Sequence, residues 1–129
     1  ICQLHDAGPS INPPFAIIVK GSELHCIVRG HESPNPTNKD VYACSFKIAD
    51  VTYDKWMNFV IYLREGYTEA HHPKTMVWVN GVKKVDSENL NSYNATNYIK
   101  FGQYKPIWGS KPTNVDKRII YFDNIHYIN

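Results

Sequence analysis

Apolar and polar side chains alternate along much of this chain, and a period of two residues is typical of β-strands that bury one face. No segment keeps the 3.6-residue period of an amphipathic helix. The pattern therefore predicts strands only, at residues 15–20, 23–29, 41–48, 56–64, 75–79, 82–85, 98–105 and 118–127.

Two short connections between these segments predict β-hairpins. Gly21-Ser22 joins the first two segments, and Asn80-Gly81 follows the segment at 75–79. Asn and Gly both tolerate positive φ, which tight hairpin turns require. Residues 30–40, with two prolines, two asparagines and a glycine, predict a long loop instead.

Eight short strands within 129 residues predict one all-β domain, built as a sandwich or jelly roll of two stacked antiparallel sheets. Trp56 and Trp78 lie in apolar segments and are predicted to be core anchors. Trp108 follows Lys105-Pro106 in a predicted loop, which makes it the better candidate for contact with a ligand.

Composition narrows the function classes. Hydrophobic residues make up 43% and charged residues 20% of the chain, values that exclude wholesale disorder. A net charge of +2 from scattered lysines gives no basis for nucleic-acid binding, and no apolar run approaches the ~20 residues of a membrane-spanning helix. The aromatic content of 13%, with nine tyrosines, favours strands and sugar or other planar ligands.

Three cysteines leave an odd count and form no C-x-x-C motif, so a zinc ribbon is not expected. Cys26 and Cys44 lie in successive predicted strands and can form one disulfide that leaves Cys2 free; three buried thiols are the alternative. Asn94-Ala-Thr96 is an N-glycosylation acceptor if the protein is secreted.

Hydrolytic chemistry has little support in this sequence. Glycoside hydrolysis needs two carboxylates placed close together, but the twelve acidic residues are dispersed and no strand carries them in alternation. No G-x-S-x-G motif is present either. His71-His72 precedes Pro73 and is interpreted as a solvated loop, because neighbouring strand residues point to opposite faces; no metal site is expected there.

Two segments carry the candidate chemistry. In an extended Gln3-Leu-His5 the amide and the imidazole share one face. In residues 98–104, Tyr98, Lys100 and Tyr104 share a face, and Gly102 leaves open floor between the last two. A phenol, an ammonium, an imidazole and an amide without a carboxylate suit a substrate that brings its own carboxylate.

Gln3-Leu-His5 resembles the Q-[IVL]-H motif of jelly-roll polysaccharide lyases, and residues 98–104 resemble their Y-[FI]-K-x-G-x-Y strand. Residues 56–64, 77–81 and 121–124 are also similar to the alginate, glucuronan and heparin lyase I-like group, in the same order. The resemblance spans nearly the whole chain and implies a concanavalin-like jelly roll.

The resemblance implies β-elimination on a uronic-acid polymer. Tyr104 is then the base, the acid or both, and His5 neutralises the carboxylate or serves as the base for the opposite C5 stereochemistry. Gln3 is expected to donate a hydrogen bond to the carboxylate. Lys100 is expected to attract the anionic substrate and lower the pKa of Tyr104. Tyr98 is expected mainly to position the strand beside the substrate.

The departures from the group lead to further expectations. Its usual R-x-E-[LV]-R segment is missing ahead of Gln3, and Arg29, Arg64 and Arg118, the only arginines, do not lie in that context. We therefore expect the chain to be either the C-terminal part of a larger lyase or a reduced relative, with another segment or partner chain completing the sheet.

The partner expected is an acidic polysaccharide outside the cell, with neither nucleic acid nor membrane. No cofactor is expected beyond a structural calcium ion, since Asp123 and Asn124 are interpreted as fixing a turn or binding calcium. A non-catalytic carbohydrate-binding or structural module is the alternative function.

Overall fold

The computed structural model describes residues 1–6, 11–32, 36–37, 39–93, 96–103 and 117–128. This part of the chain contains eight β-strands and one 3₁₀ helix, Glu69–His71. The strands are β1 (Cys2–Asp6), β2 (Phe15–Lys20), β3 (Glu23–Gly30), β4 (Tyr42–Asp50), β5 (Phe59–Arg64), β6 (Lys74–Val79), β7 (Val82–Ser87) and β8 (Asn97–Phe101).

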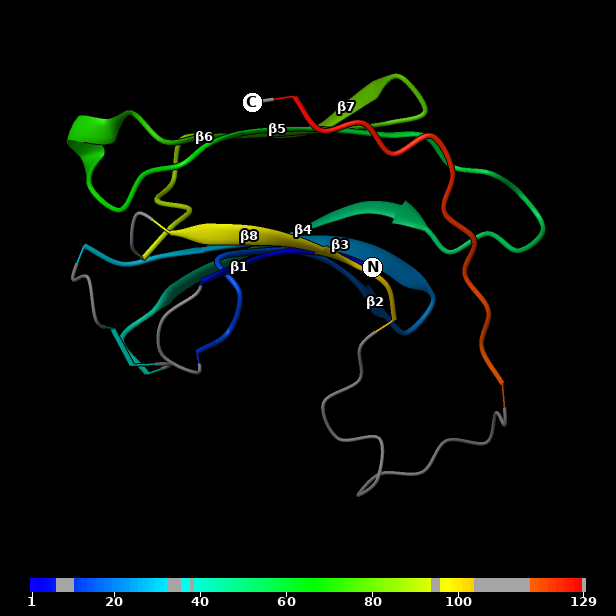
Figure 1. Ribbon diagram of the computed structural model, residues 1–129, viewed down its shortest axis with the longest axis horizontal. Coiled ribbons are helices and arrows are strands. Elements are labelled where there is room, and N and C mark those ends of the chain that lie inside the picture. The colour runs from blue at the N-terminus through cyan, green and yellow to red at the C-terminus, as the bar shows by residue number, and fades with distance from the viewer. Residues whose placement is uncertain (7–10, 33–35, 38, 94–95, 104–116, 129) are drawn as a thin grey trace.

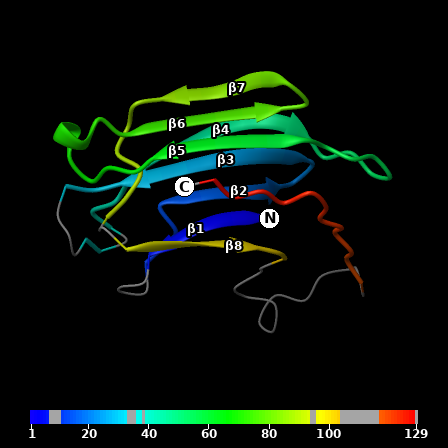
Figure 2. The same ribbon diagram turned by 45° about the horizontal axis from the view of Figure 1, so that its top comes forward.

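The strands form two sheets that lie one above the other (Figure 1). Five strands make the first sheet in the order β4-β3-β2-β1-β8, and β5-β6-β7 make the second. All neighbouring strands are antiparallel. The predicted fold class, an all-β sandwich of jelly-roll type, is thereby confirmed. Figure 2 shows β1 and β8, the first and last of these strands, side by side.

The two predicted hairpins are present, and their turns use the expected backbone conformations. Gly21 has φ +62° between β2 and β3. Asn80 and Gly81 have φ +50° and +79° between β6 and β7. Both residues of the second turn are in the left-handed region, which explains why this dipeptide joins the two strands.

The hydrophobic core lies between the facing sides of the two sheets. Phe15, Ile17 and Val28 from the five-stranded sheet and Val77 and Val85 from the three-stranded sheet are each at most 2% exposed. Burying one such side chain contributes about 1.5–3 kcal/mol. The alternating residues of the same strands form the outer face of each sheet.

Both tryptophans predicted to be core anchors lie elsewhere. Trp56 precedes β5, which begins at Phe59, and its side chain is 70% exposed. Trp78 lies between the buried Val77 and Val79 on β6, so it faces outward and is half-buried. The prediction of a core position was wrong for both tryptophans. An apolar run in the sequence does not show where strand pairing begins or which face of the sheet is covered.

The strand predicted at residues 118–127 is also absent. Residues 117–128 pair with none of the described strands and are exposed throughout. The Phe122 ring nevertheless contacts that of Phe101 on β8, with centroids 6.3 Å apart. An alternating pattern is insufficient for a strand, because the backbone must also find a hydrogen-bonding neighbour.

The predicted disulfide is not formed, since Cys2, Cys26 and Cys44 are all free thiols. Cys26 is opposite Phe46 and Cys44 is opposite Val28, so the two cysteines are diagonal rather than facing neighbours. Burial raises the pKa of Cys26 to about 12 and that of Cys2 to about 11. Cys44 is half-buried, so the alternative of three buried thiols fits two of the three.

Candidate functional site

The strand register brings the two predicted motif segments together. In the pairing of β1 with β8, Gln3 is opposite Lys100 and His5 is opposite Tyr98. The two segments are more than ninety residues apart in the sequence, yet they form neighbouring strands (Figure 2). Directly opposed side chains on antiparallel strands lie close enough to interact.

These four side chains lie on the outer face of the five-stranded sheet. The alternating residues of β1, Cys2 and Leu4, belong to the core and are 7% and 4% exposed. Gln3 and His5 therefore point the other way and are half-buried, while Tyr98 and Lys100 are exposed. Buried neighbours on β1 thus hold Gln3 and His5 in place, and the side chains on β8 are accessible to solvent.

Ring and charge contacts tie three of these residues together. The rings of His5 and Tyr98 have centroids 5.5 Å apart, and the Lys100 Nζ lies 4.9 Å from the Tyr98 centroid. A cation over an aromatic face at this distance is attracted by the ring quadrupole. Tyr98 thus positions the imidazole and the ammonium toward one region. The amide of Gln3 completes a set of hydrogen-bond donors that contains no carboxylate.

Gly102 comes directly after the end of β8. Its φ is +143°, and a Cβ added there would meet none of the described residues within 4 Å. Its backbone N–H donates to the Ile1 carbonyl at 3.0 Å, which holds the segment against the start of β1. The open floor expected between Lys100 and Tyr104 stays a prediction, because Tyr104 lies outside the described residues.

Three of the predicted site residues lie outside the described residues: Tyr104, Trp108 and Asn94. Their assigned roles in catalysis, ligand contact and glycosylation stay predictions. Asp123 and Asn124 are described, and the Asn124 backbone N–H donates to Asp123 Oδ1 at 2.8 Å. Asn124 has φ +50°, but residues 121–128 form no regular turn, so the roles in fixing a turn and in calcium binding both stay predictions.

A second polar group on the same outer face was missed by sequence analysis. His25 on β3 bonds Ser45 Oγ at 3.0 Å and Glu23 Oε2 at 2.8 Å. The Lys47 Nζ lies 2.7 Å from Glu23 Oε1 and 2.9 Å from Asp50 Oδ1. Hydrogen bonds from Lys47 and His25 lower the pKa of Glu23, and those to Glu23 and Asp50 raise the pKa of Lys47 to about 12. In this second polar group, Lys47 is therefore already paired with two carboxylates.

Two hollows in the described part of the chain lie away from the motif pair, around the loop that follows β7. One, of about 390 Å³, is lined by Tyr42 and Asn89, and the other, of about 450 Å³, by Arg64 and His72. Glu69 and Glu88 line both. In the described ranges no group of three or more His, Cys, Asp or Glu side chains is arranged to hold a metal ion. None of the described helices is long and apolar enough to cross a membrane.

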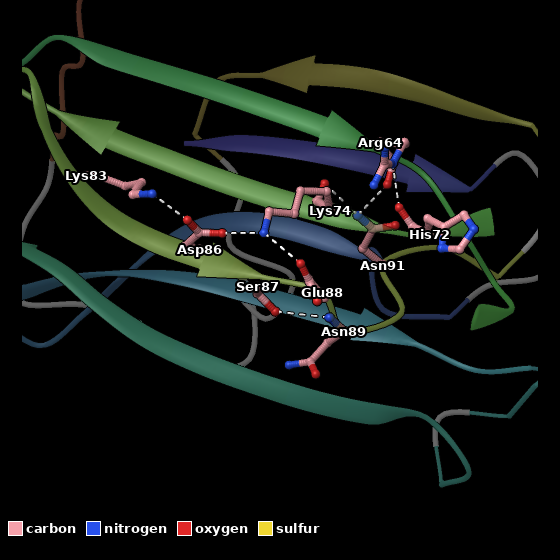
Figure 3. Close-up of polar contacts among 9 residues, drawn as sticks. All are labelled: Arg64, His72, Lys74, Lys83, Asp86, Ser87, Glu88, Asn89 and Asn91. Atoms are coloured by element: carbon pink, nitrogen blue, oxygen red, sulfur yellow. Dashed lines mark hydrogen bonds and ion pairs between the residues drawn. The ribbon is translucent and has the colours of Figure 1, made fainter. Parts of the chain in front are cut away.

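Near these hollows, Asn91 holds the ends of two strands (Figure 3). Its Nδ2 donates to the carbonyl oxygens of Arg64 and Lys74 at 3.0 and 3.3 Å and to Thr75 Oγ1 at 3.0 Å. Its Oδ1 accepts the Gly66 N–H at 2.9 Å. Asn91 is fully buried, and all four contacts are internal, so its role is structural.

An all-β sandwich that gathers an amide, an imidazole, a phenol and an ammonium on one outer face is suited to binding an acidic ligand. Residues 1–126 match the family model described as polysaccharide lyase, and the chain belongs to that family. No curated protein and no solved structure matches the chain.

Proposed function

We propose that this protein cleaves a uronic-acid-containing polysaccharide by β-elimination, as the resemblance to the alginate, glucuronan and heparin lyase I-like group implies. The observation that carries the proposal is the register of β1 against β8, which pairs Gln3 with Lys100 and His5 with Tyr98. Two motifs far apart in the sequence thereby present their polar side chains on a single face.

The first chemical task is to make the C5 proton of the sugar acidic. This proton is α to a carboxylate, whose negative charge opposes the formation of a second negative charge. Donors and cations placed around the carboxylate stabilise the charge that develops in the transition state. Gln3 and His5 supply hydrogen bonds from β1, and Lys100 supplies a positive charge from the opposite position on β8.

The second task is to move two protons. A base removes the C5 proton, and an acid protonates the departing glycosidic oxygen. We assign Tyr104 as the base, the acid or both, since it follows Gly102 in the Y-x-K-x-G-x-Y pattern. His5 takes the base role if the sugar has the opposite C5 stereochemistry.

The setting of this reaction belongs to the same proposal. The substrate is an acidic polysaccharide in the extracellular space, and the protein is secreted, with Asn94 as a glycosylation site and Trp108 as a sugar contact. Another segment or chain completes the sheet, and a structural calcium ion is bound if one is needed at Asp123 and Asn124. None of these assignments requires nucleic acid or membrane.

The test is the appearance of the unsaturated product, which absorbs near ~232 nm, on alginate, glucuronan and heparin. Tyr104→Phe is expected to lower kcat by about 10²–10⁴-fold, because it removes a proton-transfer group. Tyr53→Phe is the matched control, since Tyr53 is 82% exposed on the loop between β4 and β5. Activity that survives Tyr104→Phe would refute its role, and binding without any rise in absorbance would favour a non-catalytic carbohydrate-binding module.

A further inference from the structure

Arg29 lies on the same outer face as the motif pair, near the end of β3. Its neighbour Val28 is fully buried in the core, so the arginine side chain leaves the other face of the strand. The Arg29 backbone N–H donates to the Pro14 carbonyl at 2.6 Å, and this bond ties the end of β3 to the residue before β2.

The Arg29 guanidinium is half-buried without an acidic partner in the described part of the chain. Its side-chain contact is a 2.7 Å hydrogen bond from Nη1 to the Pro13 carbonyl. Burial lowers the pKa of Arg29 below its ordinary value, with a smaller opposing effect from Tyr93. A guanidinium carries five N–H donors, so most of them are uncommitted.

Three lysines elsewhere in these strands have a different environment. Lys47, Lys74 and Lys83 each contact a carboxylate within 3.0 Å. Removing a cation from water without a counter-charge costs free energy, which a bound anion repays. Arginine presents its donors in a planar fork that matches two carboxylate oxygens at once.

Arg29 is two strands away from His5. The β1–β2 register continues from Leu4 opposite Phe15, which places His5 beside Pro14, and Pro14 is bonded to Arg29. Two interstrand spacings separate His5 and Arg29 by roughly 10 Å between backbones. Pro14 and Ala16 lie between the two strands that carry His5 and Arg29. Both are uncharged and buried, so neither competes with His5 or Arg29 for an anion.

We infer that Arg29 binds a second acidic group of the polysaccharide, on the sugar that flanks the one held by Gln3, His5 and Lys100 on the side away from the cleaved bond. The inference rests on the proposed function and adds a direction to it: the polymer crosses the strands from β8 toward β3. A substrate with closely spaced carboxylates occupies both positions together. The shortest cleavable oligomer fills only the first position and does not reach Arg29.

The experiment compares Arg29→Gln, Arg29→Lys and the control Lys84→Ala on alginate, glucuronan and heparin, with product followed near ~232 nm. Lys84 is an exposed lysine on β7, in the other sheet. Arg29→Gln is expected to raise KM about 10-fold on the polymer with kcat within twofold, because a charge-assisted, two-pronged hydrogen bond is lost. Arg29→Lys keeps the charge and is expected to raise KM about 3-fold. Lys84→Ala is expected to change neither constant.

Two further readouts separate binding from folding. Thermal unfolding by circular dichroism shows whether Arg29→Gln remains folded; if it does not, Arg29→Lys carries the test. In the Tyr104→Phe background, binding of the same polymers by affinity electrophoresis is expected to weaken by the same factor as KM rises. On the shortest oligomer that the wild type cleaves, the folded variant is expected to match the wild type.

The outcomes distinguish this inference from the proposed function. Unchanged KM and binding in a folded Arg29 variant of an active protein would overturn the inference and leave the lyase assignment intact. A fall in kcat at constant KM would also overturn it, since Arg29 would then act on the chemical step. A wild-type protein that neither cleaves nor binds any of the three polymers would remove both.

Discussion

Lys100 on β8 and Lys74 on β6 are both lysines of antiparallel strands, but their surroundings are opposite. The Lys74 Nζ lies 2.6 Å from Asp86 Oδ1 and 3.0 Å from Glu88 Oε1 (Figure 3), and Lys83 contacts the other oxygen of Asp86. The Lys100 Nζ lies over the Tyr98 ring, and no described carboxylate forms an ion pair with it.

The comparison distinguishes a lysine whose charge is paired within the fold from a lysine whose charge stays available to a ligand. Each positive charge around Asp86 is matched inside the molecule, so little of its field reaches a substrate. An aromatic ring orients an ammonium without neutralising it. The face that carries Gln3 and His5 therefore keeps a positive charge available to a carboxylate that arrives from outside.

The largest effect is expected from removing the unneutralised cation. Lys100→Ala should lower kcat/KM on the cleaved polymer by about 10²-fold, because one charge that stabilises the transition state is lost. Lys83→Ala, which removes a cation already matched by Asp86, should change kcat/KM less than twofold. Initial rates from the absorbance of the unsaturated product measure both. Equal effects from the two substitutions would break the comparison.

The next effect concerns stability on the three-stranded side. Asn91→Ala should lower the free energy of unfolding by about 2–3 kcal/mol, because several hydrogen bonds are lost and buried partners stay unsatisfied. Well below the melting temperature, kcat should stay unchanged, since the site is on the other sheet. Urea unfolding measures the change in stability, and initial rates at about 15 and about 25 °C measure the change in kcat. A loss of activity in the folded variant would show that the two regions are coupled.

The smallest effect is the pH dependence of the Asp86 ion pairs. Hydrogen bonds from Lys74, then from Lys83, lower the pKa of Asp86 to about 2, below its ordinary value near ~3.9. A lowered pKa means that the stabilisation is complete above the ordinary value and is lost as the pH falls through about 2.

Asp86→Asn should therefore lower Tm by a few degrees at neutral pH, and the difference from the wild type should shrink toward pH 2. Melting curves of the two proteins from pH 2 to 7 measure this difference in Tm. The other carboxylates titrate in both proteins, so the difference reports on Asp86. A difference in Tm that does not change with pH would contradict an ionised, paired Asp86.

Much of the fold was predictable because its causes are local. The alternation at residues 15–20 matches β2 in both bounds, and Asn80-Gly81 is a turn because both residues accept positive φ. Predictions that needed a partner strand were less reliable. Residues 118–127 have the alternation of a strand, but no described strand pairs with them. Trp56 belongs to an apolar run, yet it lies before the first paired residue of β5.

The candidate site shows the same division. Sequence analysis selected Gln3, His5, Tyr98 and Lys100 as two separate same-face groups, and the register joined them. Cys26 and Cys44 lie on adjacent strands as expected, but a diagonal relation and free thiols replace the disulfide. Arg29 was set aside because of its local context, and only its place on the outer face makes it relevant.

The sequence by itself determined which residues extend and where the chain turns, because side-chain sterics and φ preferences act between near neighbours. It also determined the chemical groups available to the site. Only the tertiary structure decided which strands lie together, in which register, and which charges are neutralised. Those outcomes depend on packing two sheets around one core, an energy shared by residues far apart in the chain.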